Sequence, residues 1–140
     1  FAVEEDVLPS QGDAALGAKS GLHWALNLDN EVNKKFTADY KARTTKNANV
    51  FAVQGYDTAR VIAEAVNATQ GDTRDKDKLV EAIAGVTFDG PRGAFKFDPN
   101  THNVIQHIYI RDVQKVGDEL HNVILKDVGE VVDPGDDSLG

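Results

Sequence analysis

The stretch "VFAVQGYDTARVIAEAVNAT", residues 50–69, contains a long helical pattern. Its second half is amphipathic, with apolar residues returning at the spacing of an α-helix. Its first half is less regular, because an amide, a glycine, a phenol and a carboxylate follow one another at Gln54, Gly55, Tyr56 and Asp57. A helix that only packs against a core does not need these four side chains. The stretch therefore raises the question of whether the start of the helix has a function besides packing.

A second helix is expected upstream, from residue 30. Apolar side chains recur there every four residues and form one stripe between lysines and acids, at Val32, Phe36 and Tyr40. Asp29 or Asn30 can cap the first turn, because a side-chain oxygen can accept a hydrogen bond from a free backbone amide. Residues 44–49 are then expected to form the loop that leads into the long helix.

A third helix is expected downstream. Residues 71–78 are polar and turn-like, and Asp75 or Asp77 can cap a helix that continues through residues 79–84 and ends at Gly85. The segment "FDGPRG", residues 88–93, is rich in turn-forming residues and predicts a turn.

The hydrophobic period then changes from 3.6 to 2, which indicates strands. Residues 93–98 alternate, and residues 104–116 place Tyr109 and Arg111 on one face with Ile105 and His107. Residues 119–128 predict the returning strand of a hairpin that turns at residues 116–118. The segment "DPGDDSLG", residues 133–140, predicts a disordered acidic tail.

The N-terminal part adds little regular structure. Residues 1–17 predict a helical turn or two with a connection, and residues 18–26 predict a single strand. The predicted order is therefore one strand, three helices and three strands, an α/β chain. A lone strand before three helices makes a poor core, so the fold requires further strands that this chain does not supply. We expect one incomplete domain.

Composition excludes several classes of partner. The 140 residues carry a net charge of −8 without a cluster of lysines and arginines, so no nucleic acid partner is expected. No apolar run approaches the ~20 residues that cross a bilayer. The chain has no cysteine for disulfides or thiolate chemistry. It also has no methionine and opens on Phe1, which predicts a processed product or an excised fragment.

The sequence has no motif for catalysis or metal binding. His107 and His121 could face each other across the predicted hairpin, but His23 and His102 lie in other elements, and no pair has the helical spacing of metal ligands. No glycine–serine nucleophile turn and no phosphate-binding loop occurs. We therefore expect neither an enzyme nor a cofactor.

Four stretches together resemble a known family. They are "LDNEVNKKFTADYKART", "VFAVQGYDTARVIAEAV", "FDGPRGAFKFDPNTHNVIQHIYIRDV" and "NVILKDV". Their order and spacing, over about residues 6–134, resemble the C-terminal part of type I periplasmic solute-binding proteins. These proteins serve ABC importers for branched-chain amino acids, aromatic acids and related compounds.

The resemblance implies a partial type I fold. The family has two doubly wound α/β lobes, joined by three crossings, with the ligand between them. On this chain the resemblance implies the end of the second lobe at residues 1–17 and a return to the first lobe at residues 18–103. Final strands at residues 104–128 and a tail at residues 129–140 would follow. Most of both parallel sheets would be absent.

The resemblance also implies a function. The parent protein is expected to capture a small carboxylate-bearing metabolite in the periplasm and to deliver it to an ABC permease, with its signal peptide outside this chain. The alternatives are a ligand-sensing regulatory or receptor domain on the same fold, and a self-contained structural or interaction module. The fragment alone is expected to bind ligand weakly or not at all and to self-associate.

Four residues are candidates for ligand contact. In the family the long helix begins near Asn49, so its first turns point at the cleft, with Phe51 and Gln54 toward the ligand. His23 and Trp24 end the predicted strand and could border the cleft. Ordinary roles remain open for all four: core packing for Phe51, an exposed amide for Gln54, and a surface loop for the other two.

The other polar residues of the opening stretch are expected to have structural roles. Tyr56 is rotated about 140° from Phe51 on a helix, which predicts packing between helix and sheet. Asp57 is expected to pair with Arg60 or with a neighbouring loop. Arg92, in the segment "GPRG", is expected to brace its own turn.

Overall fold

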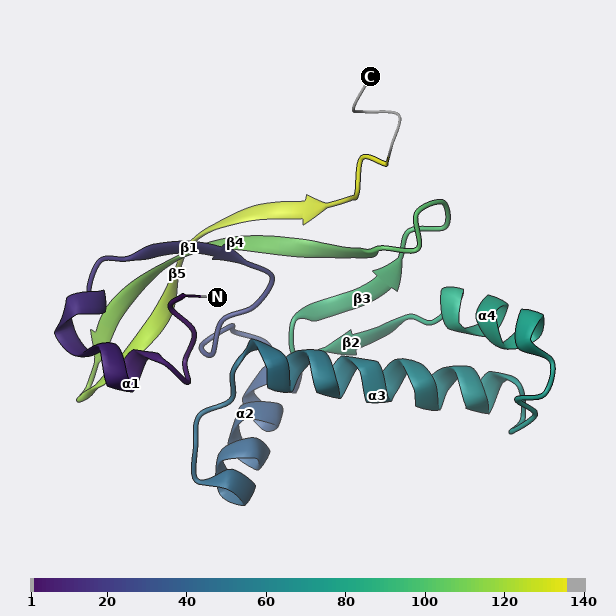
Figure 1. Cartoon of the computed structure of the whole chain (residues 1–140), viewed down its shortest axis with the longest axis horizontal. Coiled ribbons are helices and arrows are strands. Elements are labelled where there is room, and N and C mark those ends of the chain that lie inside the picture. The colour runs from purple at the N-terminus through teal and green to yellow at the C-terminus, as the bar shows by residue number, and fades with distance from the viewer. Residues whose placement is uncertain (1, 136–140) are drawn as a thin grey trace.

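Three helices lie between the first strand and the other four strands of the chain, in a computed structural model that describes residues 2–135 (Figure 1). The α1 helix and the β4–β5 turn lie at one end of the molecule, and α4 lies at the other. The elements are α1 (Leu8–Gln11), the 3-10 helix η1 (Gly12–Ala15), β1 (Lys19–Leu22), α2 (Glu31–Thr44), α3 (Val50–Ala68), α4 (Lys76–Ala84), β2 (Phe88–Gly90), β3 (Gly93–Phe97), β4 (Val104–Val116) and β5 (Glu119–Val131).

Side-chain caps fix the starts of the three long helices. Asn30 accepts a hydrogen bond from the Asn33 amide at the start of α2, and Asn49 accepts one from the Ala52 amide at the start of α3. Asp75 does the same for α4, so the expected caps at residues 30 and 75 are confirmed. The α3 helix also has the predicted extent, and it buries one face through Val50, Val53, Asp57, Val61 and Ala65.

The sheet is open and its pairings between described strands are antiparallel. Its order is β1-β4-β3-β2, and β5 pairs with the other side of β4. The long β4 strand is the centre, because both β1 and β3 pair with it at different heights. The β4–β5 turn falls at Gly117–Asp118, where Gly117 has a φ of +61° that suits glycine.

Three strand predictions were wrong in extent. The expected strand at residues 18–26 is paired only at residues 19–22, because the chain turns away to bury Trp24. The segment expected to be only a turn contains β2, whose Gly90 pairs with Gly93 around Pro91 and Arg92. The last strand continues to Val131, three residues into the expected tail. Residues 136–140 of that tail lie outside the described residues.

The apolar residues form three separate clusters. One gathers around Trp24, Val50 and Val53, where α2 and α3 meet the loop after β1. A second lies between α3, α4 and the β2–β3 hairpin, and the third lies between α1 and β4. No helix in the described part of the chain is long and apolar enough to cross a membrane. Small clusters along an open sheet agree with the expected mixed α/β chain.

Candidate functional site

The four candidate residues occupy different environments at the start of α3 and the end of β1. Phe51 lies in the first turn of α3 with 52% of its surface exposed. Gln54 lies three residues further along and is half-buried. Because residues three apart are neighbours on a helix surface, these two side chains share one side of α3. His23 and Trp24 follow β1 directly, and both are buried.

Trp24 is enclosed completely by the chain itself. Its indole Nε1 donates a hydrogen bond of 2.8 Å to Asn33 Oδ1, and Asn33 in turn donates to the carbonyls of Leu26 and Leu28. The ring packs with Val50 and Val53 of α3. In this structure Trp24 therefore joins the loop after β1 to α2 and α3, and it presents no exposed surface.

His23 and Gln54 meet at one hollow, which we call the His23 hollow. It has a volume of about 410 Å³ and is lined by these two residues, by residues 131–134 at the end of β5 and just beyond it, and by Arg92, Asn103, Gln106 and Ile108 among others. The Nε2 atom of His23 is buried and has no hydrogen-bond partner among the described residues. The start of α3 and the end of β1 thus contribute to one partly polar depression.

The imidazole of His23 is uncharged at neutral pH. Burial, followed by the charges of Arg92 and Arg111, lowers its pKa from 6.5 to about 4. A neutral imidazole has one donor and one acceptor nitrogen, so His23 can hydrogen-bond a polar group without bringing a charge to the hollow.

Arg92 lines the same hollow and forms a buried ion pair with Asp57. Its Nε donates to Asp57 Oδ2 at 2.5 Å, and its Nη1 donates to Gln106 Oε1 at 2.6 Å. The expected neighbouring-loop role of Asp57 is confirmed, whereas Arg60 pairs with Glu64 instead. Arg92 was expected to brace its own turn, and its two hydrogen bonds also connect the β2–β3 hairpin to α3 and β4.

The ring of Tyr56 packs against α2. Its ring meets Phe36 of α2 edge-on, with ring centroids 5.3 Å apart. Packing between helix and sheet was predicted for this residue, and the ring contact observed here is with α2.

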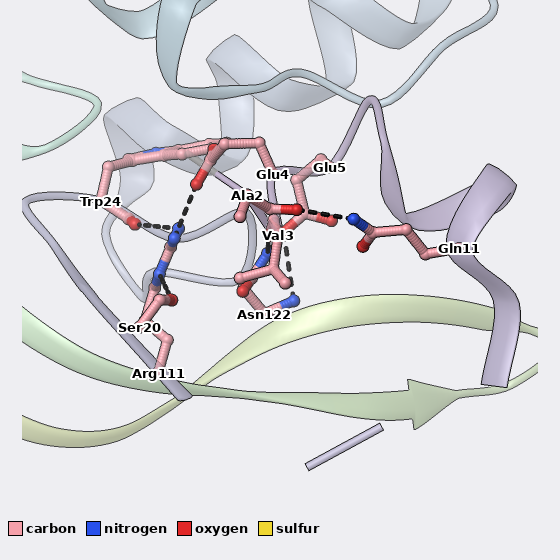
Figure 2. Close-up of polar contacts among 9 residues, drawn as sticks. All are labelled: Ala2, Val3, Glu4, Glu5, Gln11, Ser20, Trp24, Arg111 and Asn122. Carbon is pink, nitrogen blue, oxygen red and sulfur yellow. Dashed lines mark hydrogen bonds and ion pairs between the residues drawn. The ribbon is translucent and has the colours of Figure 1, made fainter. Parts of the chain in front are cut away.

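A buried ion pair joins the N-terminal segment to β4 (Figure 2). Glu4 Oε1 lies 2.6 Å from Arg111 Nη2, and both side chains are 1% exposed. Arg111 also donates to the Trp24 carbonyl and to Ser20 Oγ. One arginine of β4 therefore holds β1, the loop after it and the N-terminal segment together.

The next residue, Glu5, hydrogen-bonds to Asn122 of β5. Its Oε1 accepts hydrogen bonds of 3.1 Å from both the backbone and the side-chain amide of Asn122. Burial raises the pKa of Glu5, and the hydrogen bonds of Asn122 oppose that rise. Its Oε2 is buried and accepts no hydrogen bond from a described residue.

Glu5 also lines a second, larger hollow with a volume of about 820 Å³, which we call the Glu5 hollow. This hollow lies between the N-terminal segment, the α2–α3 loop and the β4–β5 turn, and it is lined by Tyr40, Lys41, Asn47, Asn49 and Glu119 among others. Sequence reasoning missed this network. One feature of the sequence could have indicated it. Arg111 is on the same strand face as Tyr109, and a charge on an apolar face requires a buried partner.

The described residues contain no group of three or more histidine, cysteine, aspartate or glutamate side chains that could hold a metal ion. His107 pairs with Asp127 and His121 lies beside Glu119, so the two histidines do not face each other across the hairpin. The His23 hollow offers hydrogen-bonding groups from an imidazole and an amide, and the exposed Phe51 ring lies on the same side of α3 as Gln54.

Comparison with known proteins identifies the class. The periplasmic binding protein family matches residues 1–118, so the chain belongs to this family. Its members are binding proteins of transport systems and not enzymes, in agreement with the resemblance noted from the sequence.

Individual relatives are similar over nearly the whole chain. The Leu/Ile/Val-binding protein homolog 6 of Brucella abortus (strain 2308) is 33% identical over 135 residues, which is 94% of this chain and 34% of that protein. A solute-binding protein of an ABC transporter from Rhodopseudomonas palustris BisB5, in complex with 3,4-dihydroxybenzoic acid, is 38% identical with a TM-score of 0.87, covering 94% of this chain and 36% of its own. An R. palustris solute-binding protein in complex with benzoate is 32% identical with a TM-score of 0.85, covering 96% and 36%. The chain spans about a third of the length of each.

Proposed function

We propose that the chain is the C-terminal part of a periplasmic solute-binding protein that captures a small carboxylate-bearing metabolite and delivers it to an ABC permease. The observation that carries this proposal is the likeness to the R. palustris protein in complex with 3,4-dihydroxybenzoic acid, at 38% identity and a TM-score of 0.87. The chain spans 36% of that protein, which supports a longer parent whose other segments complete the two lobes.

The solute contacts are proposed to come from the start of α3 and the end of β1. Phe51 offers an exposed aromatic face for the apolar part of the solute, and aromatic stacking is worth about 0.5–1.5 kcal/mol beyond area burial. Gln54 can donate and accept at once, and neutral His23 can do the same through its two nitrogens. Trp24 contributes indirectly, because its buried ring fixes the loop that carries His23.

Between the two ligand classes we favour an aromatic acid. Solute-binding proteins in complex with 3,4-dihydroxybenzoic acid, p-hydroxybenzoic acid and benzoate are 32–38% identical to this chain. The Brucella relative, at 33% identity, is named for leucine, isoleucine and valine, so a branched-chain amino acid is the second candidate. An exposed phenylalanine suits either side chain, but stacking favours a flat ring.

The mechanism would be closure of two lobes around the solute, without a covalent step. The chain by itself holds only part of such a cleft, so it would bind solute weakly or not at all. It would also self-associate, because β5 leaves one edge unpaired among the described strands and several large apolar side chains are exposed, including Ile62, Leu125, Val128 and Val131.

Calorimetric titration tests the function. The full-length protein that contains this chain is titrated with benzoate, 4-hydroxybenzoate and leucine, and the 140-residue chain is titrated in parallel. We expect one of these solutes to bind the full-length protein with at least micromolar affinity, and the chain alone to give no measurable heat. Binding of neither class by the full-length protein would refute the proposal, and light scattering that shows a stable monomer would refute self-association of the chain.

A further inference from the structure

Most polar side chains that line the His23 hollow are hydrogen-bonded to other side chains of this chain. Arg92 donates from Nε to the Asp57 carboxylate and from Nη1 to Gln106 Oε1. Asn103 donates from its side-chain amide to the carboxylate of Asp133, and both of these residues line the hollow as well. The charged groups of the lining therefore already have partners within the chain.

His23 and Gln54 are the two polar side chains of the lining that are not engaged in this way. Among residues 2–135, neither side chain takes part in a hydrogen bond. His23 is buried, and its Nε2 atom has no partner among these residues. A buried polar atom without a partner is less stable than one that is hydrogen-bonded, so a solute group that bonds to His23 gains affinity.

The two side chains favour a neutral group that can donate and accept at once. A neutral imidazole has one donor and one acceptor nitrogen, and a glutamine amide also offers both functions. The charges of Arg92 and Arg111 act on His23, and they disfavour an ammonium group at this place. A buried carboxylate would need a charged partner, but Arg92 is already paired with Asp57. A hydroxyl group can donate to one of the two free side chains and accept from the other.

The hollow also has apolar walls of suitable size for a small solute. Val104 and Ile108 of β4 and Val131 of β5 line it beside the polar groups. Its volume of about 410 Å³ is within the range of ~300–1,000 Å³ for small-molecule sites. A ring that carries a hydroxyl group therefore finds apolar contacts and two hydrogen-bonding partners in one place.

We propose that His23 and Gln54 select a solute that carries a hydroxyl group, by hydrogen bonds from that hydroxyl to the imidazole and to the amide. The inference rests on the proposed function and narrows its solute to a hydroxylated aromatic acid. The same acid without the hydroxyl leaves both polar side chains without a partner when it fills the hollow. A site built to bond a hydroxyl group discriminates strongly against an analogue that lacks it.

Calorimetric titration of the full-length protein with benzoate, 3-hydroxybenzoate and 4-hydroxybenzoate tests the selection. The preference is the dissociation constant for benzoate divided by that for the tighter hydroxybenzoate, and we expect a value of about ten or more. His23→Phe keeps a ring but removes both nitrogens, and Gln54→Leu removes the amide. Each variant should lower the preference to below about threefold. Damage to the fold would weaken all three acids together and would leave this ratio unchanged.

The matched control for Gln54→Leu is Glu64→Leu. Glu64 is also a half-buried residue of α3, but it does not line the His23 hollow, so this variant should keep the full preference. Circular dichroism verifies that each variant is folded, and if His23→Phe does not fold, Gln54→Leu carries the test.

Two kinds of failure can be told apart. Equal affinity of the unmodified protein for the three acids, an unchanged preference in both variants, or binding of leucine alone would overturn the hydroxyl assignment and leave solute capture standing. Binding of neither leucine nor any of the three acids would overturn the hydroxyl assignment together with the proposed function.

Discussion

The buried histidine beside the start of α3 makes the stability of the chain depend on pH. His23 is 8% exposed, and its pKa is lowered from 6.5 to about 4, first by burial and then by the charges of Arg92 and Arg111. In the unfolded chain the imidazole binds a proton below its ordinary pKa, whereas in the folded chain it stays neutral down to about pH 4. Between these two values the unfolded state therefore binds more protons.

The sign and size of the effect follow from this difference. Where the unfolded state binds more protons, the free energy of unfolding falls as pH falls. Each pKa unit corresponds to about 1.4 kcal/mol, so lowering the pH from about 7.5 to about 5 should cost about 2 kcal/mol through His23 alone. The loss is complete only below about pH 4, where the folded chain also takes up the proton.

Urea unfolding at several pH values between about 5 and 7.5 measures this contribution. Trp24 is the single tryptophan and is fully buried, so its fluorescence reports unfolding next to His23. The variant His23→Gln keeps a neutral polar side chain that does not titrate. We expect the difference in stability between the two chains to shift by about 2 kcal/mol over this range, in favour of the variant at low pH. A difference that does not change with pH would refute the neutral, buried assignment of His23.

Three further substitutions test the packing around the site by urea unfolding. Arg111→Ala leaves Glu4 buried without its partner and should cost about 3–5 kcal/mol, and a cost below 1 kcal/mol would contradict the buried pair. Gly90→Ala places a Cβ atom 2.9 Å from Asp57 Oδ1, and the hydrogen bond from Arg92 holds that carboxylate in place. The overpacking should cost about 1–3 kcal/mol. A neutral result would show that the carboxylate can move. Asn49→Ala removes the cap of α3 and should cost about 1 kcal/mol, measurable also as lost helical circular dichroism, and unchanged values would exclude the cap.

The helices could be predicted from sequence because their signals are local. Asn30 and Asp75 stand directly before amphipathic patterns, and a side-chain oxygen at that position satisfies a free amide within one turn. The β4–β5 turn was equally local, with Gly117 between two alternating segments. The long α3 helix required the family resemblance for its first turn, because its polar residues interrupt the apolar period.

The buried contacts of Glu4 and Arg111 could not be predicted, because the partners are distant in sequence. Glu4 and Arg111 are 107 residues apart, and nothing near either residue indicates the other. Strand β2 could not be predicted, because its three residues are too few to show an alternating pattern. It forms through its pairing with β3. The burial of Trp24 depends in the same way on Asn33 in the next helix.

Solute contact by the first turns of α3 can be tested directly. Phe51 and Ile62 provide a matched pair, since both are apolar residues of α3 with 52% and 56% of their surface exposed. The measurement is the dissociation constant of the full-length protein for the solute identified by titration, with Phe51→Ala and Ile62→Ala compared. We expect the loss of the aromatic face to weaken binding about tenfold or more, and the Ile62 variant to bind like the unmodified protein. Equal affinities in the two variants would contradict solute contact by Phe51.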